Sequence, residues 1–129
     1  MILFINTSDF NNLTLVLQDG DKVRLLTKSV AYNENYKTNE FLATFLKHSR
    51  IKPSDLTKII VCSGPGSFTG IRVGLSLAQA LGFALKIPVI AIPKNKVPED
   101  VRKLSKVKGG KSLVVHYGQQ PNITKPRKK

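Results

Sequence analysis

The segment "SGPGSFTG" (63–70) has the residue types that could hold a ligand, because its glycines stand between an apolar run and a helical pattern. Glycine-rich turns of this kind present backbone N–H groups to phosphates. A P-loop requires a lysine directly after its last glycine, and no lysine follows Gly70. The dinucleotide fingerprint G-x-G-x-x-G also fails, since Thr69 stands in its last position and residues 56–98 contain no acid to bind a ribose. We therefore predict a tight turn whose helix is capped by Ser67 or Thr69, with any anion as a secondary ligand.

The side chains that most often carry out catalysis are few in this chain. His48 and His116 lie far apart in the sequence, and neither belongs to a metal-binding spacing such as H-E-x-x-H. Cys62 ends an apolar run without a neighbouring histidine, which favours an inert buried thiol over a nucleophile. The G-x-S-x-G pattern of hydrolases does not occur around Ser67. The sequence therefore predicts no catalytic residue, no metal site and no cofactor of the chain's own.

The helix expected over residues 69–86 carries a stripe of small residues. Gly70, Gly74, Ala78 and Gly82 recur at four-residue spacing. A glycine inside a helix costs about 1 kcal/mol relative to alanine, so this stripe indicates that another backbone comes close. The helix is apolar on nearly every side and needs cover on two of them. The stripe packs inside the subunit or forms a subunit interface, and we expect a mixture of the two.

Apolar runs and period-two patterns predict the remaining elements. The expected strands are 2–6, 12–18, 22–31, 58–63 and 88–92, and the expected helices are 37–50 and 69–86. The resulting β-β-β-α-β-α-β order predicts an α/β fold, with a mixed sheet and helices packed on it.

The pattern fails after Pro93. We expect one domain over 1–93 and a basic C-terminal extension over 94–129, with one possible short strand at 112–118. The extension holds eleven Lys or Arg and two acidic residues, in a chain whose formal net charge is +13. Such a balance indicates a polyanion partner, most often nucleic acid, or a solvated extension.

Targeting signals are not evident in the sequence. The first ten residues lack a basic region and a cleavage site, and read as a strand. The apolar run 71–85 is interrupted by Arg72, Ser76 and Gln79, so we expect it to be too short and too polar to span a bilayer. With a single cysteine, these features predict a cytoplasmic protein without a membrane partner.

The run "SGPGSFTGIRVGLSLAQALGFAL" closely resembles the signature of the TsaB (YeaZ) family. The segments "ILFINTS", "LTKIIVCS" and "IPVIAI" fit that family in order and spacing, so the resemblance covers residues 1 to about 93. It implies an actin/Hsp70/sugar-kinase-like (ASKHA, ribonuclease H-like) domain. It also implies a glycoprotease-like subunit in the biosynthesis of threonylcarbamoyladenosine, the modified adenosine that lies beside the anticodon of tRNA. The partners implied are a TsaD-type transferase, a TsaE-type ATPase and, through their complex, tRNA; a homodimer is expected when the chain is alone.

The resemblance also implies roles for particular residues. The contact with the transferase is built from the two helices, and the implied interface residues are Phe41, Phe45, Gly70, Gly74, Ala78 and Gly82. Contacts with an anion or nucleotide are implied for Asn6, Thr7, Ser67 and Thr69, with ATP or ADP at the interface with the transferase. Attraction of tRNA is expected from Lys125, Arg127, Lys128 and Lys129.

Two departures from related enzymes predict a non-catalytic subunit, a pseudo-enzyme. Asn6 stands where ASKHA enzymes carry an acid, and an amide is a poorer magnesium ligand than a carboxylate. The H-x-x-x-H metal pair of TsaD-like enzymes is absent. The residues after Ile92 are too few for the second domain of the family, and we expect a natural short form rather than a truncated one. The alternatives are an ATP-using or glycoprotease-like hydrolase and a free-standing basic RNA-binding module.

Overall fold

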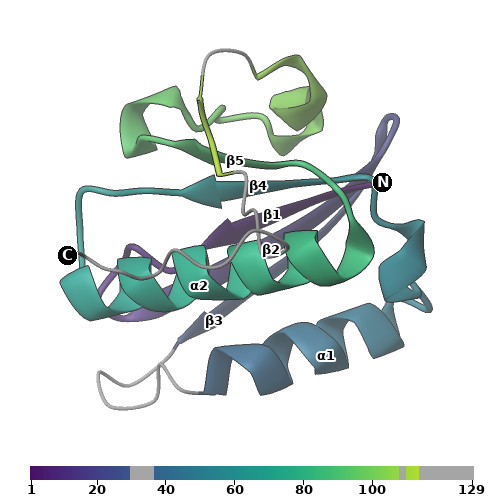
Figure 1. The fold of residues 1–129 in the computed structure, drawn as a ribbon, viewed down its shortest axis with the longest axis horizontal. Helices are drawn as coiled ribbons and strands as arrows, with labels where there is room; N and C mark the ends of the chain where they lie inside the picture. Colours follow the sequence, from purple (N-terminus) through teal and green to yellow (C-terminus); the bar gives the residue numbers. More distant parts are fainter. Residues whose placement is uncertain (30–36, 108–109, 114–129) are drawn as a thin grey trace, which may run out of the picture.

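A six-stranded mixed sheet forms the centre of the computed structural model, which describes residues 1–29, 37–107 and 110–113 (Figure 1). The strand order is β3-β2-β1-β4-β5-β6. The strands are β1 (Ile2–Asn6), β2 (Asn12–Asp19), β3 (Lys22–Ser29), β4 (Lys58–Cys62), β5 (Val89–Ile92) and β6 (Lys111–Ser112). The helices are α1 (Thr38–His48) and α2 (Phe68–Leu85), with 3-10 turns η2 (Pro53–Asp55), η3 (Lys94–Lys96) and η4 (Val101–Lys106). The predicted α/β class and the β-β-β-α-β-α-β order are confirmed.

The direction of each strand follows from the length of its connection. β1, β2 and β3 form an antiparallel meander, because short turns join them; Gly20, between β2 and β3, has the positive φ of +62° that such a turn requires. β4 lies parallel to β1, and β5 lies parallel to β4, because α1 and α2 provide the crossovers. The three parallel strands therefore end at one edge of the sheet.

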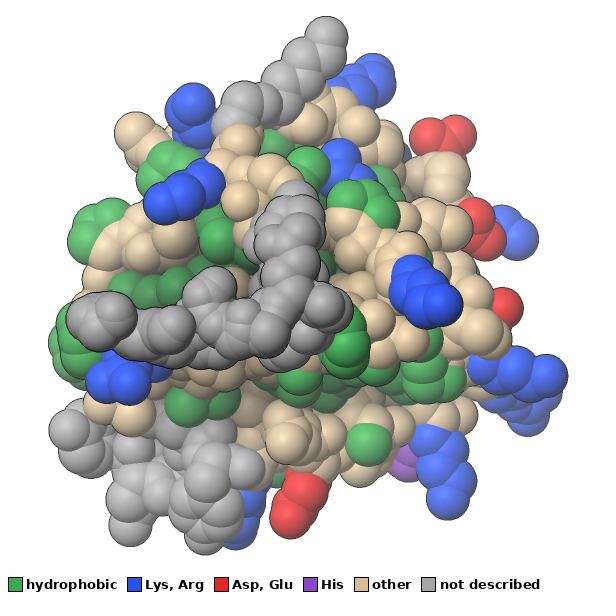
Figure 2. Space-filling view, viewed as in Figure 1, with side chains coloured by type: hydrophobic (Ala, Val, Ile, Leu, Met, Phe, Trp, Pro, Cys, Tyr) green, Lys and Arg blue, Asp and Glu red, His purple; other side chains and the backbone are tan. Residues whose placement is uncertain are grey.

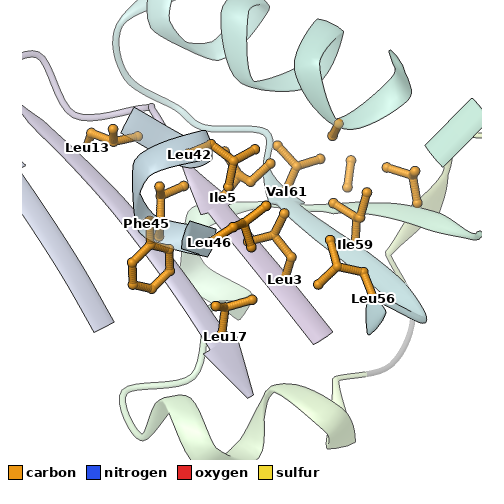
Figure 3. Close-up of a cluster of buried hydrophobic side chains, with 14 residues drawn as sticks. Leu3, Ile5, Leu13, Leu17, Leu42, Phe45, Leu46, Leu56, Ile59 and Val61 are labelled. Atoms are coloured by element: carbon orange, nitrogen blue, oxygen red, sulfur yellow. The ribbon is translucent and has the colours of Figure 1, made fainter. Parts of the chain in front are cut away.

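Both helices cover the same face of the sheet. Leu42, Phe45 and Leu46 of α1 point at the sheet, where side chains of β1, β2 and β4 meet them (Figure 3). Alternation along β1 places Leu3 and Ile5 in this cluster, and both are fully buried. The helical spacing that predicted α1 therefore also fixes which of its side chains form the core.

The opposite face of the sheet is covered by the segment after β5. Leu104 of η4 is fully buried there with Phe4, Val16 and Ile60. Burying a leucine side chain stabilises a fold by about 1.5–3 kcal/mol. The predicted domain boundary at residue 93 is therefore wrong for the described part of the extension, which belongs to the same folded unit.

A buried amide fixes the position of this covering segment. The side chain of Gln18 on β2 is 2% exposed, and its Oε1 accepts from the backbone N–H of Ser105 at 3.0 Å. Its Nε2 donates to the carbonyl of Arg102. A single buried glutamine thereby pairs with two backbone groups of η4 through part-buried hydrogen bonds.

The predicted strand at 112–118 corresponds only in its first residue to β6, which pairs antiparallel with β5. Residues 114–118 lie outside the described residues, as do Lys125, Arg127, Lys128 and Lys129.

By length and composition α2 is long and apolar enough to cross a membrane, contrary to the prediction made for residues 71–85. The same helix packs on the sheet through its buried stripe, which is the usual reason for an apolar helix in a folded domain.

Candidate functional site

The connections that leave the parallel strands meet at one edge of the sheet. β1 leads into residues 7–11, β4 into the glycine loop 63–67, and β5 into η3. In open α/β sheets, ligands bind outside the carboxyl ends of the strands, so this edge is the first place to look for a site.

Hydrogen bonds tie these connections together. The backbone N–H of Ser67 donates to the carbonyl of Ser8 at 2.7 Å, and that of Lys94 donates to the carbonyl of Gly64 at 2.8 Å. Gly66 has a φ of +157°, and a Cβ there would collide with the Ser8 carbonyl oxygen. The glycine is required because the loop lies directly against the backbone that follows β1.

Three of the four residues expected to contact a nucleotide are engaged inside the chain. The Oγ of Ser67 accepts from the N–H of Gly70 at 3.1 Å, which confirms the predicted N-cap of α2. The hydroxyl of Thr7 donates to the carbonyl of Gly70, and both Thr7 and Ser67 are 3% exposed. The Oδ1 of Asn6 accepts from the N–H and the hydroxyl of Ser8.

The fourth residue, Thr69, is exposed on the first turn of α2. The hydroxyl of Thr7 and the capping Oγ of Ser67 hold the start of the helix against the end of β1, and the Asn6 amide braces the turn that follows β1. The geometry is that of a structural joint between β1 and α2.

The small-residue stripe of α2 faces this chain's own sheet. Gly70, Gly74, Ala78 and Gly82 are all buried. A Cβ on Gly70 would collide with the carbonyl oxygen of Thr7, one on Gly74 with the Thr7 hydroxyl, and one on Gly82 with Val89. The interpretation of these four residues as part of a partner interface is therefore wrong, and the alternative of close packing inside the subunit is correct.

The two phenylalanines expected at the interface lie in different environments. Phe45 is 9% exposed and belongs to the core beneath α1, so the interface interpretation is wrong for it as well. Phe41 is half-buried, with the Nζ of Lys28 at 4.7 Å from its ring centroid.

The side of α2 opposite the stripe, and its junction with α1, are at least partly exposed. Hydrophobic side chains gather along this junction, with Lys and Arg around its border (Figure 2). One groove is lined by Asn39, Thr69, Arg72, Val73, Ser76, Leu77 and Ala80. A second, more apolar groove continues between the helices and includes Leu42, Ala43, Leu46, Leu77 and Leu81. The signal for this face was present in the sequence, since Val73, Leu77 and Ala80 are apolar and lie opposite the glycines.

Groups able to do acid–base or metal chemistry are scarce on this surface. Within residues 1–29, 37–107 and 110–113, no three His, Cys, Asp or Glu side chains cluster as a metal site would require. Cys62 is fully buried and its Sγ lies 3.6 Å from the Ser8 hydroxyl, as predicted for an inert thiol. The pKa of Asp100 is lowered because its carboxylate accepts hydrogen bonds from the side chain and backbone of Arg102. Both residues are far from the glycine loop 63–67 in the sequence.

Comparison with known proteins identifies the group to which this chain is related. A profile of the family described as "TsaD: tRNA N6-adenosine threonylcarbamoyltransferase" matches residues 30–97. The curated protein "tRNA threonylcarbamoyladenosine biosynthesis protein TsaB" of Bacillus subtilis is 32% identical over 91 residues, which are 70% of this chain and 40% of that protein. The protein of the same name from Buchnera aphidicola of Schizaphis graminum is 29% identical over 71% of this chain and 43% of its own length.

A solved structure supports the same conclusion at the level of the fold. YeaZ from Pseudomonas aeruginosa superposes with a TM-score of 0.68 and 23% identity, over 74% of this chain and 45% of that chain. The chain thus spans about two fifths of the length of the curated relatives it matches. The family profile covers just over half of the chain, and with the relatives and the shared ASKHA-like fold it shows that the chain belongs to the TsaB/YeaZ family.

Proposed function

We propose that this chain is a non-catalytic partner subunit in the biosynthesis of threonylcarbamoyladenosine in tRNA. It pairs with a TsaD-type transferase and supports the transfer of a threonylcarbamoyl group to adenosine. The observation that carries this proposal is the two-sided character of α2. Its glycine stripe lies on the sheet, while its other side presents Val73, Leu77 and Ala80 beside α1.

The joint at the carboxyl edge supports the non-catalytic role. Asn6, Thr7 and Ser67 already hydrogen-bond within the chain, so binding a nucleotide there would require some of these bonds to break. We therefore assign ATP or ADP to the interface with the transferase or with a TsaE-type ATPase rather than to this chain alone. The cytoplasm is the compartment that this role requires, and a homodimer through the same helix face is the state we expect for the isolated chain.

Co-purification with a co-expressed TsaD-type transferase tests the interface. Ser76 is exposed in the α2 groove, so Ser76→Arg places a large charged side chain in the contact without disturbing the core. Ser105→Arg is the matched control, because Ser105 is exposed on η4, which covers the other face of the sheet. We expect Ser76→Arg to abolish co-purification and Ser105→Arg to preserve it. Unchanged co-purification of the Ser76→Arg variant would exclude this face as the interface.

A further inference from the structure

Two exposed phenylalanines stand at the carboxyl edge of the parallel strands. Phe68 is 74% exposed and Phe10 is 62% exposed, the highest values among the large hydrophobic side chains that the structure describes. A single exposed apolar side chain needs no explanation, but here two exposed aromatic side chains stand on connections that are hydrogen-bonded to each other.

The two rings belong to segments that are fixed to one another. Phe68 directly follows Ser67, whose N–H donates to the carbonyl of Ser8 at 2.7 Å, and Phe10 is two residues beyond Ser8. In Figure 1 the connection after β1 accordingly lies beside the start of α2. Gly66 reinforces this approach, because any side chain there would push the segments apart.

A cation lies beside the Phe68 ring, and a second cation pairs with the residue that precedes Phe10. The guanidinium of Arg72 is 5.7 Å from the ring centroid of Phe68. The Nζ of Lys94 lies 3.2 Å from Asp9 Oδ1, next to Phe10 in the chain, and both side chains are well exposed. We call the set Phe10, Phe68, Arg72 and Lys94 the aromatic edge; Asp9 is the acidic group paired within it.

We propose that the aromatic edge binds unpaired nucleotides of RNA, with bases stacked on the two rings and phosphates held by Arg72 and Lys94. Exposed aromatic rings flanked by cations are the arrangement used for single-stranded nucleic acid, because every base has a face that can stack. Arg72 and Lys94 outnumber Asp9 at this edge, and this local excess of positive charge favours an anionic ligand. This inference rests on the proposed function only in naming tRNA as the RNA that the complex would present.

The test measures binding of the full chain to a short fluorescent single-stranded oligoribonucleotide and to the same sequence as a duplex. Stacking contributes about 1–3 kcal/mol per base, so Phe68→Ala and Phe10→Ala are each expected to weaken single-strand binding by roughly five- to 150-fold. Duplex binding is expected to change little, since paired bases present no free face. Phe83→Ala is the matched control, because Phe83 is 52% exposed near the other end of α2.

The salt dependence separates the cations from the rings. Arg72→Gln or Lys94→Gln is expected to reduce the slope of log K against log salt by about 0.7, the value for one phosphate contact on a single strand. Phe68→Ala is expected to leave that slope unchanged while lowering affinity.

Two results would overturn the proposal. In the first, Phe68→Ala and Phe10→Ala lower the affinity for single-stranded RNA no more than Phe83→Ala does. The other is loss of co-purification with the transferase in these variants while RNA binding persists, which would assign the edge to a protein contact. The RNA measurement uses the isolated chain, so it still tests this proposal if the chain does not co-purify with the transferase.

Discussion

Thr7 and Gly70 join the end of β1 to the first turn of α2. The Thr7 hydroxyl donates to the Gly70 carbonyl, and the Thr7 carbonyl occupies the space that a Cβ on Gly70 would need. The helix backbone therefore lies directly on the end of the strand at Gly70, and against the Thr7 side chain at Gly74.

This contact predicts different costs for two glycine substitutions. Gly70→Ala drives a methyl group into a backbone oxygen, and Gly74→Ala drives one into the Thr7 hydroxyl. Each gains about 1 kcal/mol of helix propensity but is overpacked, a change that typically costs about 1–3 kcal/mol. We expect both variants to be destabilised in urea unfolding, Gly70→Ala more strongly because a backbone oxygen cannot rotate away.

A double mutant distinguishes the two collisions. Thr7→Ala removes the hydroxyl that obstructs Gly74→Ala but keeps the carbonyl that obstructs Gly70→Ala. We therefore expect Thr7→Ala to restore part of the stability lost in Gly74→Ala and none of the stability lost in Gly70→Ala. A double-mutant cycle of unfolding free energies measures both effects. Additive free energies of unfolding in both backgrounds would contradict the assignment of the colliding atoms.

η4 covers the second face of the sheet, so we expect a substitution of its buried leucine to lower the free energy of unfolding strongly. Leu104 is fully buried, so Leu104→Ala is expected to lower the free energy of unfolding by about 2–5 kcal/mol. Leu25→Ala is the control, since Leu25 is 58% exposed and its loss should cost less than about 0.5 kcal/mol. Equal stability of the two variants in urea would show that η4 does not hold the sheet.

The buried amide of Gln18 gives a polar counterpart to that experiment. Gln18→Leu keeps the side chain's approximate size but leaves the N–H of Ser105 and the carbonyl of Arg102 without their partner. A typical hydrogen bond contributes about 0.5–1.5 kcal/mol net, so this variant is expected to unfold at a lower urea concentration than the wild type. Faster hydrogen exchange at the Ser105 amide would locate the loss on η4, and unchanged exchange there would argue against the hydrogen bond.

The Asp100–Arg102 pair predicts a small dependence of stability on pH. Arg102 lowers the pKa of Asp100 from its ordinary value of 3.8 in the folded chain. A lowered folded pKa means that the stabilisation is present above the unfolded pKa and is lost as pH falls through the folded value. Asp100→Asn, which keeps a capping oxygen, should therefore melt slightly below the wild type at neutral pH and together with it in strong acid. A difference that persists in acid would assign the effect to the cap instead of the charge.

Periodicity located the helices and most strands because each buries a regularly spaced face. Leu3 and Ile5 on one side of β1, and Phe4 on the other, follow directly from alternation. The direction of the glycine stripe could not be obtained in this way. Small residues at four-residue spacing show that a backbone comes close, but they do not show whose backbone it is.

The role of the segment after β5 was also beyond the sequence patterns. Leu104 is a single buried leucine in a run rich in lysine and arginine, and a 3-10 turn of six residues has no long apolar period to detect. Ser105, which donates its N–H to Gln18, is distant from it in the sequence, so no local motif could predict this hydrogen bond.

The burial of Leu104 has an electrostatic consequence. Arg102, Lys103 and Lys106 are exposed on the same turn whose leucine is fixed in the core, so their charges have a set direction relative to the sheet. Charges on a rigid support contribute to a permanent molecular dipole. In the field of a polyanion, such a dipole exerts a torque that orients the protein before contact, and the orientation weakens as salt screens the field.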